Sequence, residues 1–283
     1  MKGEVAMIRT ARFAGSWYTN DPTKLKAVID SSIAEIGSIM PSRFAVLPHA
    51  GLSYSKRGIA PFFGGDFSAV ERIVIIAPSH YAHIAPDRLA SAPFSAAQTP
   101  LGNLKVIALS EARTDYREAI EAEHALEMIL PYIANLPSPP AISMALLSHF
   151  STAEAISKLA DALIEELGEK NIREGKTLLI ASSDFTHYGP RFSYTPFGRD
   201  GQAGTKESDL AFANLLIEGN TEEAYRLATS QRLTICGHAA SVLVAEIATR
   251  FEAEGRIHSY YTSSDVQPSF DPNFVAYATL LWS

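Results

Sequence analysis

Residues 72–80 read RIVIIAPSH, an apolar, β-branched run that ends at proline and serine and is followed by a histidine. A short apolar run bounded in this way is typical of a buried strand in a largely parallel sheet. Three further runs have the same form: FAVLP before His49, ISMALLS before His149 and TLLIASSDFT before His187. In open α/β sheets, ligands bind at the carboxyl ends of the strands. We therefore expect these imidazoles to meet in one site, which we interpret as a metal site.

Helical patterns alternate with the strands. Residues 20–37 have Asn20 or Asp21 as a cap before Pro22 at the first helical position, and Ser151 with Glu154 forms a capping-box pattern ahead of another helix. We predict further helices over residues 116–133, 206–219, 221–229 and 238–255, late strands over 257–264 and 274–282, and loops over 84–103 and 188–204. This alternation predicts a single α/β domain over residues 1–283, with a central, largely parallel or mixed sheet flanked by helices.

Composition limits the class of protein. The chain has 283 residues and is 47% hydrophobic, which is enough for a sizeable core. A net charge of −7 argues against a general nucleic-acid surface. No apolar stretch is long enough to span a bilayer, and the N-terminal residues lack the apolar core of a signal peptide. The single cysteine excludes an internal disulfide framework and fits a reducing cytoplasm. We expect a cytoplasmic protein whose partner is a small molecule or a peptide, with neither nucleic acid nor membrane involved.

His49 and His80 have matching surroundings. Pro48 stiffens the strand end before His49, and Gly51 permits a tight turn beside the imidazole. His80 also follows a proline at a strand terminus, in APSHYAH. Either histidine alone is typical of a hydrogen-bonded structural residue. Their matching contexts favour a shared role.

A second group of candidates follows the last parallel strand and precedes a helix. Asp184 and His187 are suited to acid–base chemistry, or Asp184 orients a histidine through a hydrogen bond. The structural alternative is that Asp184 caps a turn and His187 packs on Tyr188. Cys236 in TICGHAAS stands at a predicted helix N-terminus, where the helix dipole favours a thiolate. Cys236 is then a metal ligand or a nucleophile, unless it is a small buried apolar residue.

Other polar residues have weaker patterns. His124 and Glu127 share a predicted helix face. His149 has no second polar partner nearby in the sequence, and we interpret His83 and His258 as surface or structural residues.

Six motifs together resemble the Memo family, whose members also occur in the AmmeMemoRadiSam gene set. The matching motifs, in the order of the family, are PHAGLSYS, APSHYAH, TPLG, EHALEMILPY, SSDFTHYG and TICGH. The resemblance runs from about Arg12 to the C-terminus. It implies a fold similar to the class III extradiol dioxygenases, which bind non-haem iron(II) through two histidines and a glutamate.

In Memo proteins a cysteine replaces that glutamate. The resemblance therefore implies that His49, His80 and Cys236 are the metal ligands, that His187 lies in the same pocket as a catalytic residue, and that Asp184 is its motif neighbour. A thiolate ligand favours iron(II), which we expect here, with copper or zinc as alternatives.

The chain departs from its relatives at two positions. Tyr81 stands where many relatives have a second histidine, and Ile129 stands where they often have a polar residue, which would make the pocket region more apolar. Three hypotheses on function remain open. The first is a metal-dependent redox enzyme, and the second is a former enzyme pocket that binds a peptide or small ligand. The third is a hydrolase with Cys236 as nucleophile.

Overall fold

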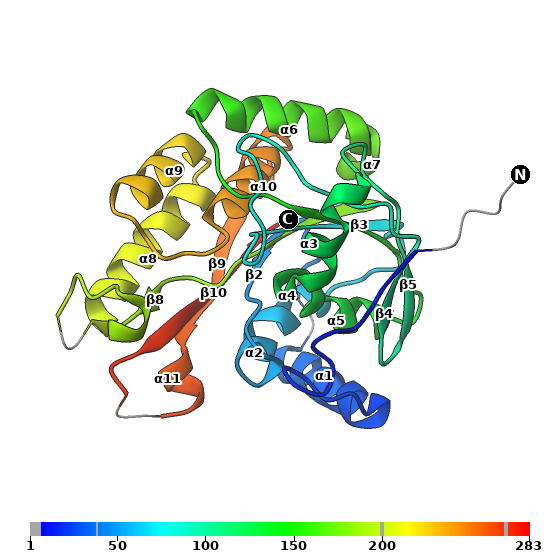
Figure 1. Ribbon diagram of the computed structural model, residues 1–283, viewed down its shortest axis with the longest axis horizontal. Coiled ribbons are helices and arrows are strands. Elements are labelled where there is room, and N and C mark those ends of the chain that lie inside the picture. The colour runs from blue at the N-terminus through cyan, green and yellow to red at the C-terminus, as the bar shows by residue number, and fades with distance from the viewer. Residues whose placement is uncertain (1–6, 38, 199–200, 269–270) are drawn as a thin grey trace, which may run out of the picture.

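A computed structural model describes residues 7–37, 39–198, 201–268 and 271–283. The described chain folds around a seven-stranded sheet in the order β6-β3-β7-β2-β10-β8, with β9 paired to β10 (Figure 1). The strands are β2 Phe44–Leu47, β3 Arg72–Ala77, β6 Ala141–Leu146, β7 Thr177–Ser182, β8 His187–Tyr188, β9 Gly255–Thr262 and β10 Phe274–Trp282.

The sheet is mixed, as the sequence predicted. Strands β6, β3, β7 and β2 run parallel to one another. Strand β10 is antiparallel to β2, β8 and β9. The parallel strands are apolar almost throughout because helices cover both faces of the sheet.

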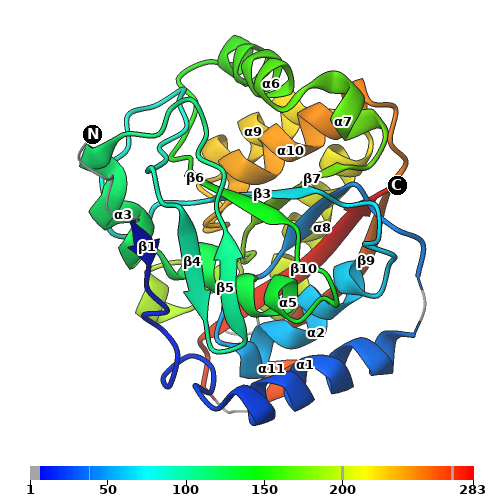
Figure 2. The ribbon, with the colours of Figure 1, turned by 90° about the vertical axis from the view of Figure 1, so that its right-hand side faces the viewer.

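The period of two along each strand divides the core into two layers. Phe44 and Val46 face one cluster, while Ala45 and Leu47 face the other. Figures 1 and 2 show the helices on opposite sides of the sheet. On one side are α6 Ala153–Leu167, α7 Glu169–Arg173, α8 Gln202–Ile217, α9 Thr221–Ser230 and α10 His238–Arg250. On the other side are α1 Pro22–Ile36, α2 Leu52–Phe63, α4 His124–Glu127 and α5 Leu130–Ala134. The remaining helical segments are η1 Thr114–Tyr116, α3 Arg117–Ala122, η2 Pro190–Phe192 and α11 Ser263–Val266.

One predicted helix cap is confirmed and one is wrong. The carboxylate of Asp21 accepts hydrogen bonds from the backbone N–H groups of Thr23 and Lys24, so Asp21 caps α1. Helix α6 begins after Thr152 without a side-chain cap. Ser151 instead donates its backbone N–H and its hydroxyl to Asp87, which removes it from the expected capping box. Among the described residues, no helix combines the length and the apolar character needed to cross a bilayer.

The helix predicted over residues 116–133 is broken into the short helices α3, α4 and α5. Its first break lies at Glu123, whose backbone is extended with φ −82° and ψ 112°. The Glu123 carbonyl accepts a hydrogen bond from the buried Arg9 guanidinium, and the Glu123 carboxylate caps α4 at Ala125. These contacts replace the helical hydrogen bonds that the break removes.

The predicted loop over residues 84–103 is partly wrong. It contains β4 Ala96–Thr99 and the first residues of β5 Gly102–Lys105, which form a hairpin. With β1 Ile8–Arg9 they make a second sheet of three strands. The hairpin turn uses Gly102 at a φ of 130°, which favours glycine. The stretch 188–204 is mainly irregular, but α8 already begins at Gln202; residues 199–200 lie outside the described chain.

Candidate metal centre

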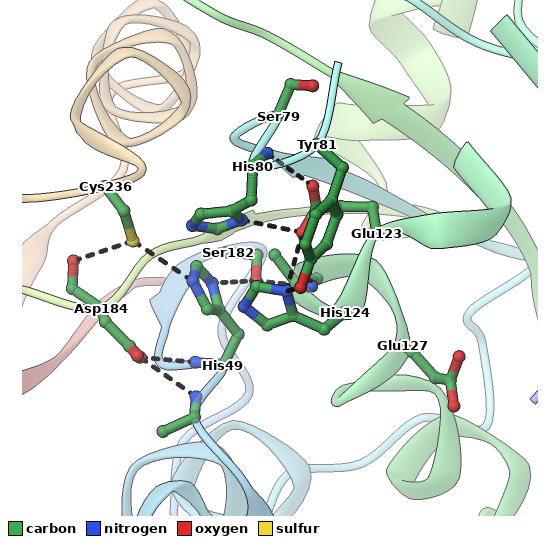
Figure 3. A network of polar contacts seen from close by, with 12 residues as sticks. His49, Ser79, His80, Tyr81, Glu123, His124, Glu127, Ser182, Asp184 and Cys236 are labelled. Carbon is green, nitrogen blue, oxygen red and sulfur yellow. Dashed lines mark hydrogen bonds and ion pairs between the residues drawn. The ribbon is translucent and has the colours of Figure 1, made fainter. Parts of the chain in front are cut away.

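The carboxyl ends of β2, β7 and β3 lie side by side and bring His49 and His80 together. Strand β7 lies between β2 and β3 and ends at Ser182. The Nδ1 atom of His49 lies 2.9 Å from the Ser182 hydroxyl. The rings of His49 and His80 are 5.4 Å apart between centroids and nearly perpendicular. Figure 3 shows both imidazoles above the end of the sheet.

Cys236 joins these two histidines from the segment before α10. One ligand atom from each of His49, His80 and Cys236 lies within 4.8 Å of the other two. The Cys236 Sγ is 3.2 Å from the Nε2 of His49 (Figure 3). The structure thus brings together the three residues that the resemblance to the Memo family assigned to a metal.

Hydrogen bonding fixes the proton on the His49 ring. The Ser182 hydroxyl donates its only hydrogen to the Ala125 carbonyl at 2.6 Å. Ser182 must therefore accept from His49, so that Nδ1 of His49 carries the proton and Nε2 has a free lone pair. Complete burial, with the charges of His124 and His80 nearby, lowers the pKa of His49 well below its usual range. His49 is consequently neutral and presents a ligand nitrogen toward Cys236.

A buried carboxylate orients His80 in the same way. Glu123 accepts from the His80 backbone N–H at 2.7 Å and contacts Nδ1 of the ring at 2.8 Å. Burial raises the pKa of Glu123, but hydrogen bonds and charge from His80 outweigh it, and the pKa is lowered. An ionised Glu123 accepts a proton from Nδ1, so Nε2 is the ring nitrogen of His80 that could bind a metal. Carboxylate–histidine pairs of this kind orient ligands in metal sites.

Cys236 has a different electrostatic setting from the one we predicted. Burial raises the pKa of its thiol well above the usual range, and the negative charge of Asp184 raises it further. The expected low-pKa thiolate is therefore wrong for the metal-free protein. Desolvation outweighs the backbone N–H of Gly237 at the start of α10. A bound cation would have to displace the thiol proton.

Asp184 is directed toward the backbone of the His49 loop. Its Oδ1 accepts from the N–H groups of His49 at 2.7 Å and Ala50 at 3.3 Å. Burial raises the pKa of Asp184, although the charge of His187 and these N–H donors oppose the shift. Of the roles considered for Asp184, these contacts fit the positioning of a histidine-bearing loop. A role in proton transfer stays a prediction.

His187 lies beside the cluster of His49, His80 and Cys236 but is not one of the residues whose ligand atoms lie within 4.8 Å of one another. Strand β8 carries it next to β10, and its charge acts on His49 and Asp184. Its Nδ1 is 3.1 Å from the Phe185 carbonyl and 3.0 Å from the Thr234 carbonyl. Because carbonyls only accept, Nδ1 of His187 carries a proton. The ring is partly exposed and does not pack on Tyr188 in any described ring contact.

The sequence did not identify Glu123, and it left the role of His124 open. The His124 ring is 4.4 Å from the His80 ring and 4.5 Å from the Trp17 ring, centroid to centroid. Its Nδ1 is 3.0 Å from the Tyr81 hydroxyl, so Tyr81 occupies the rim of the site. Burial and the charge of His80 lower the pKa of His124 to about 4. The sequence offered the adjacent pair Glu123 and His124, but helical periodicity placed both inside one continuous helix.

Three other residues named from the sequence lie outside the site. His149 is exposed and contacts the Ser148 hydroxyl, because β6 lies on the outer side of β3. The expected four-histidine site is therefore wrong. Glu127 points away from His124 (Figure 3) and forms a buried ion pair with Arg9 at 2.7 Å. Ile129 is fully buried in the core and is not a pocket residue.

Comparison with known proteins places these residues in a family. The family profile described as "Memo-like protein" matches residues 9–281. The MEMO1 family protein MHO1 of Saccharomyces cerevisiae is 33% identical over 221 residues, which cover 71% of this chain and 64% of the yeast protein. Protein MEMO1 of Mus musculus is 30% identical over 95% of each chain, and Protein MEMO1 of Xenopus tropicalis is 29% identical over 96% of each. The chain belongs to the Memo family.

Proposed function

We propose that the chain binds iron(II) through His49, His80 and Cys236 and uses it for redox chemistry on a small molecule. One observation carries the proposal: one ligand atom from each of two imidazoles and one thiol lies within 4.8 Å of the other two. Two nitrogens and one sulfur suit iron(II), copper(I) or zinc and disfavour magnesium and calcium. Such a donor set also leaves coordination positions for a substrate.

The residues present fit a metal in charge as well as in geometry. Two neutral imidazoles and one thiolate carry a single negative charge, and the ionised Glu123 lies behind His80. A divalent cation would balance both negative charges. When bound, the metal would supply a Lewis acid and, as iron or copper, an electron-transfer centre.

His187 is the proton acceptor in this proposal. Its Nδ1 proton is held by two carbonyls, so Nε2 is the ring nitrogen that would take a proton from a substrate. Asp184 keeps the His49 loop in place through two backbone N–H groups. Resemblance to the class III extradiol dioxygenases supports redox chemistry over hydrolysis. The raised pKa of Cys236 also disfavours a nucleophilic thiolate in the metal-free protein.

Metal binding and chemistry can be tested separately. Iron(II) is titrated anaerobically into the wild-type protein, Cys236→Ser and His149→Ala, an exposed-histidine control. We expect Cys236→Ser to weaken binding by at least about tenfold, since an alcohol replaces a thiolate, and His149→Ala to bind normally. Equal affinity in all three proteins would contradict the proposed site.

The redox step is measured as substrate-dependent dioxygen uptake by the iron(II) form, with a panel of phenols, thiols and small carboxylic acids. His187→Ala should lower the rate and leave the metal content unchanged. Ordinary catechols should be poor substrates, because a thiolate ligand changes the charge and redox behaviour of the site. If no compound supports uptake while metal binds normally, the pocket is a binding module for a peptide or small ligand. The exposed rings of Tyr81 and Trp17 beside His124 would then provide its contact surface.

A further inference from the structure

Two segments of the chain contact each other closely beside His49, His80 and Cys236. Residues 183–187 follow β7, and residues 234–237 precede α10. The Gly237 N–H donates to the Ser183 hydroxyl at 3.1 Å, and the Cys236 Sγ lies 3.5 Å from the Asp184 carbonyl oxygen. A side chain at Gly237 would bring its Cβ to 2.4 Å from the Ser182 carbonyl oxygen. The close approach of the two loops therefore requires glycine at this position.

Thr234 holds both the backbone and the ring of His187. The His187 N–H donates to the Thr234 Oγ1 at 3.0 Å, and the same hydroxyl donates to the His187 carbonyl at 2.8 Å. The Thr234 carbonyl also lies 3.0 Å from Nδ1 of His187. One residue thus satisfies two backbone groups and, with Phe185, fixes which ring nitrogen carries the proton.

Thr234 stands two positions before Cys236 in the same loop. Ile235 between them is 1% exposed and packs in the core, which keeps Thr234 and Cys236 in a fixed relation. Because Thr234 and Cys236 belong to the same short segment, a shift of this segment when Cys236 binds a metal would also move the Thr234 carbonyl that contacts the His187 ring.

We propose that Thr234 is a positioning residue that couples metal capture at Cys236 to the orientation of His187. The coupling would present the base in its working position only when the ligand thiolate is in place. This inference rests on the proposed metal site. It adds a residue that touches neither metal nor substrate and acts through its neighbours.

Matched variants separate this role from general stability. Thr234→Val keeps the shape of the side chain and removes the hydroxyl, so both backbone groups of His187 lose their partner. Thr234→Ser retains the hydroxyl. Thr229→Val is the control, because the Thr229 hydroxyl donates only to the helix carbonyls of Tyr225 and Arg226.

The first measurement uses metal-free protein and ¹⁵N NMR of the histidine rings, with the His187 signals assigned by their loss in His187→Gln. We expect wild type, Thr234→Ser and Thr229→Val to show a protonated Nδ1 and an unprotonated Nε2 at His187. Thr234→Val should show a mixture of both tautomers, because the released His187 backbone would no longer hold the ring against the Phe185 and Thr234 carbonyls. A Thr234→Val spectrum identical to wild type would overturn the positioning role.

The second measurement is a zinc titration of the same proteins. In wild type and Thr234→Ser, the His187 signals should shift in step with zinc occupancy. In Thr234→Val, zinc should still bind one ion per chain without the same shift at His187. Zinc binding that leaves His187 unchanged in wild type would overturn the coupling alone. Absence of zinc binding in wild type would overturn the proposed function and the coupling with it, while the tautomer result would still report on Thr234.

Discussion

Replacing Glu123 with Gln tests whether the buried carboxylate orients His80. Three N–H groups point at this carboxylate: the His80 backbone, the His80 ring and the Ala125 backbone. Gln offers one acceptor oxygen, and its NH₂ group would face a donor. Loss of an orienting carboxylate weakens metal binding by about 10–100-fold, or about 1.4–2.7 kcal/mol. The unpaired buried donor and the lost charge should lower the free energy of unfolding by about 2–4 kcal/mol.

The assay is an anaerobic zinc or iron(II) titration against a competing chelator, together with thermal unfolding of the metal-free protein. Glu121→Gln is the matched control, since Glu121 lies two residues away and accepts only from the exposed Thr10 hydroxyl. We expect the control to bind metal like wild type. A Glu123→Gln protein that retains metal affinity within about twofold, despite reduced stability, would refute the orienting role.

Three further predictions concern protons and accessibility. Because the pKa of Cys236 is raised, each metal ion that binds should release one proton from the thiol. Metal affinity should then rise about tenfold per pH unit until the pH reaches that pKa. A metal affinity that does not depend on pH between about pH 6 and 8 would exclude displacement of the thiol proton. Because only the thiolate reacts, alkylation of Cys236 in metal-free protein should be slow at neutral pH and faster at higher pH. Bound zinc should suppress the reaction, and equal labelling rates with and without zinc would show that Cys236 is not a ligand. Arg9→Met should lower the free energy of unfolding by about 3–5 kcal/mol, because it leaves Glu127 buried without its charge partner. A change below about 1 kcal/mol would contradict the assignment of this pair as a buried ion pair that stabilises the fold.

Local patterns were sufficient for the strands of the main sheet except β8, and for the choice of His49, His80 and Cys236 as candidates. The ligand set itself came from the resemblance to the Memo family. His49 and His80 each follow an apolar run and a proline, and that context is local in the sequence. The order of the strands is not local. Because β7 lies between β3 and β2, His49 and His80 meet above Ser182, whereas β6 is the outermost parallel strand. With strands about 4.8 Å apart, the end of β6 lies about 14 Å from that of β2, so His149 does not reach the site.

The carboxylate behind His80 could not be predicted because helical periodicity favours a continuous helix through Glu123. The break depends on Arg9, which is more than a hundred residues away in the sequence and donates to the Glu123 carbonyl. Arg9 also determines the position of Glu127, for which the helical spacing to His124 suggested a shared role. Glu127 instead binds Arg9 and the backbone N–H groups of Arg12 and Phe13. Tertiary contacts therefore determined which carboxylate faces the metal centre.

X-ray absorption of the zinc- or iron(II)-loaded protein tests the central claim most directly. The chain has a single cysteine, so a thiolate sulfur bound to the metal must come from Cys236. For zinc, we expect one sulfur at about 2.3 Å and two imidazole nitrogens at about 2.0–2.1 Å. The sulfur shell should disappear in Cys236→Ser, while the imidazole shell persists. A wild-type spectrum without sulfur, or an unchanged sulfur shell in the variant, would contradict the site of His49, His80 and Cys236.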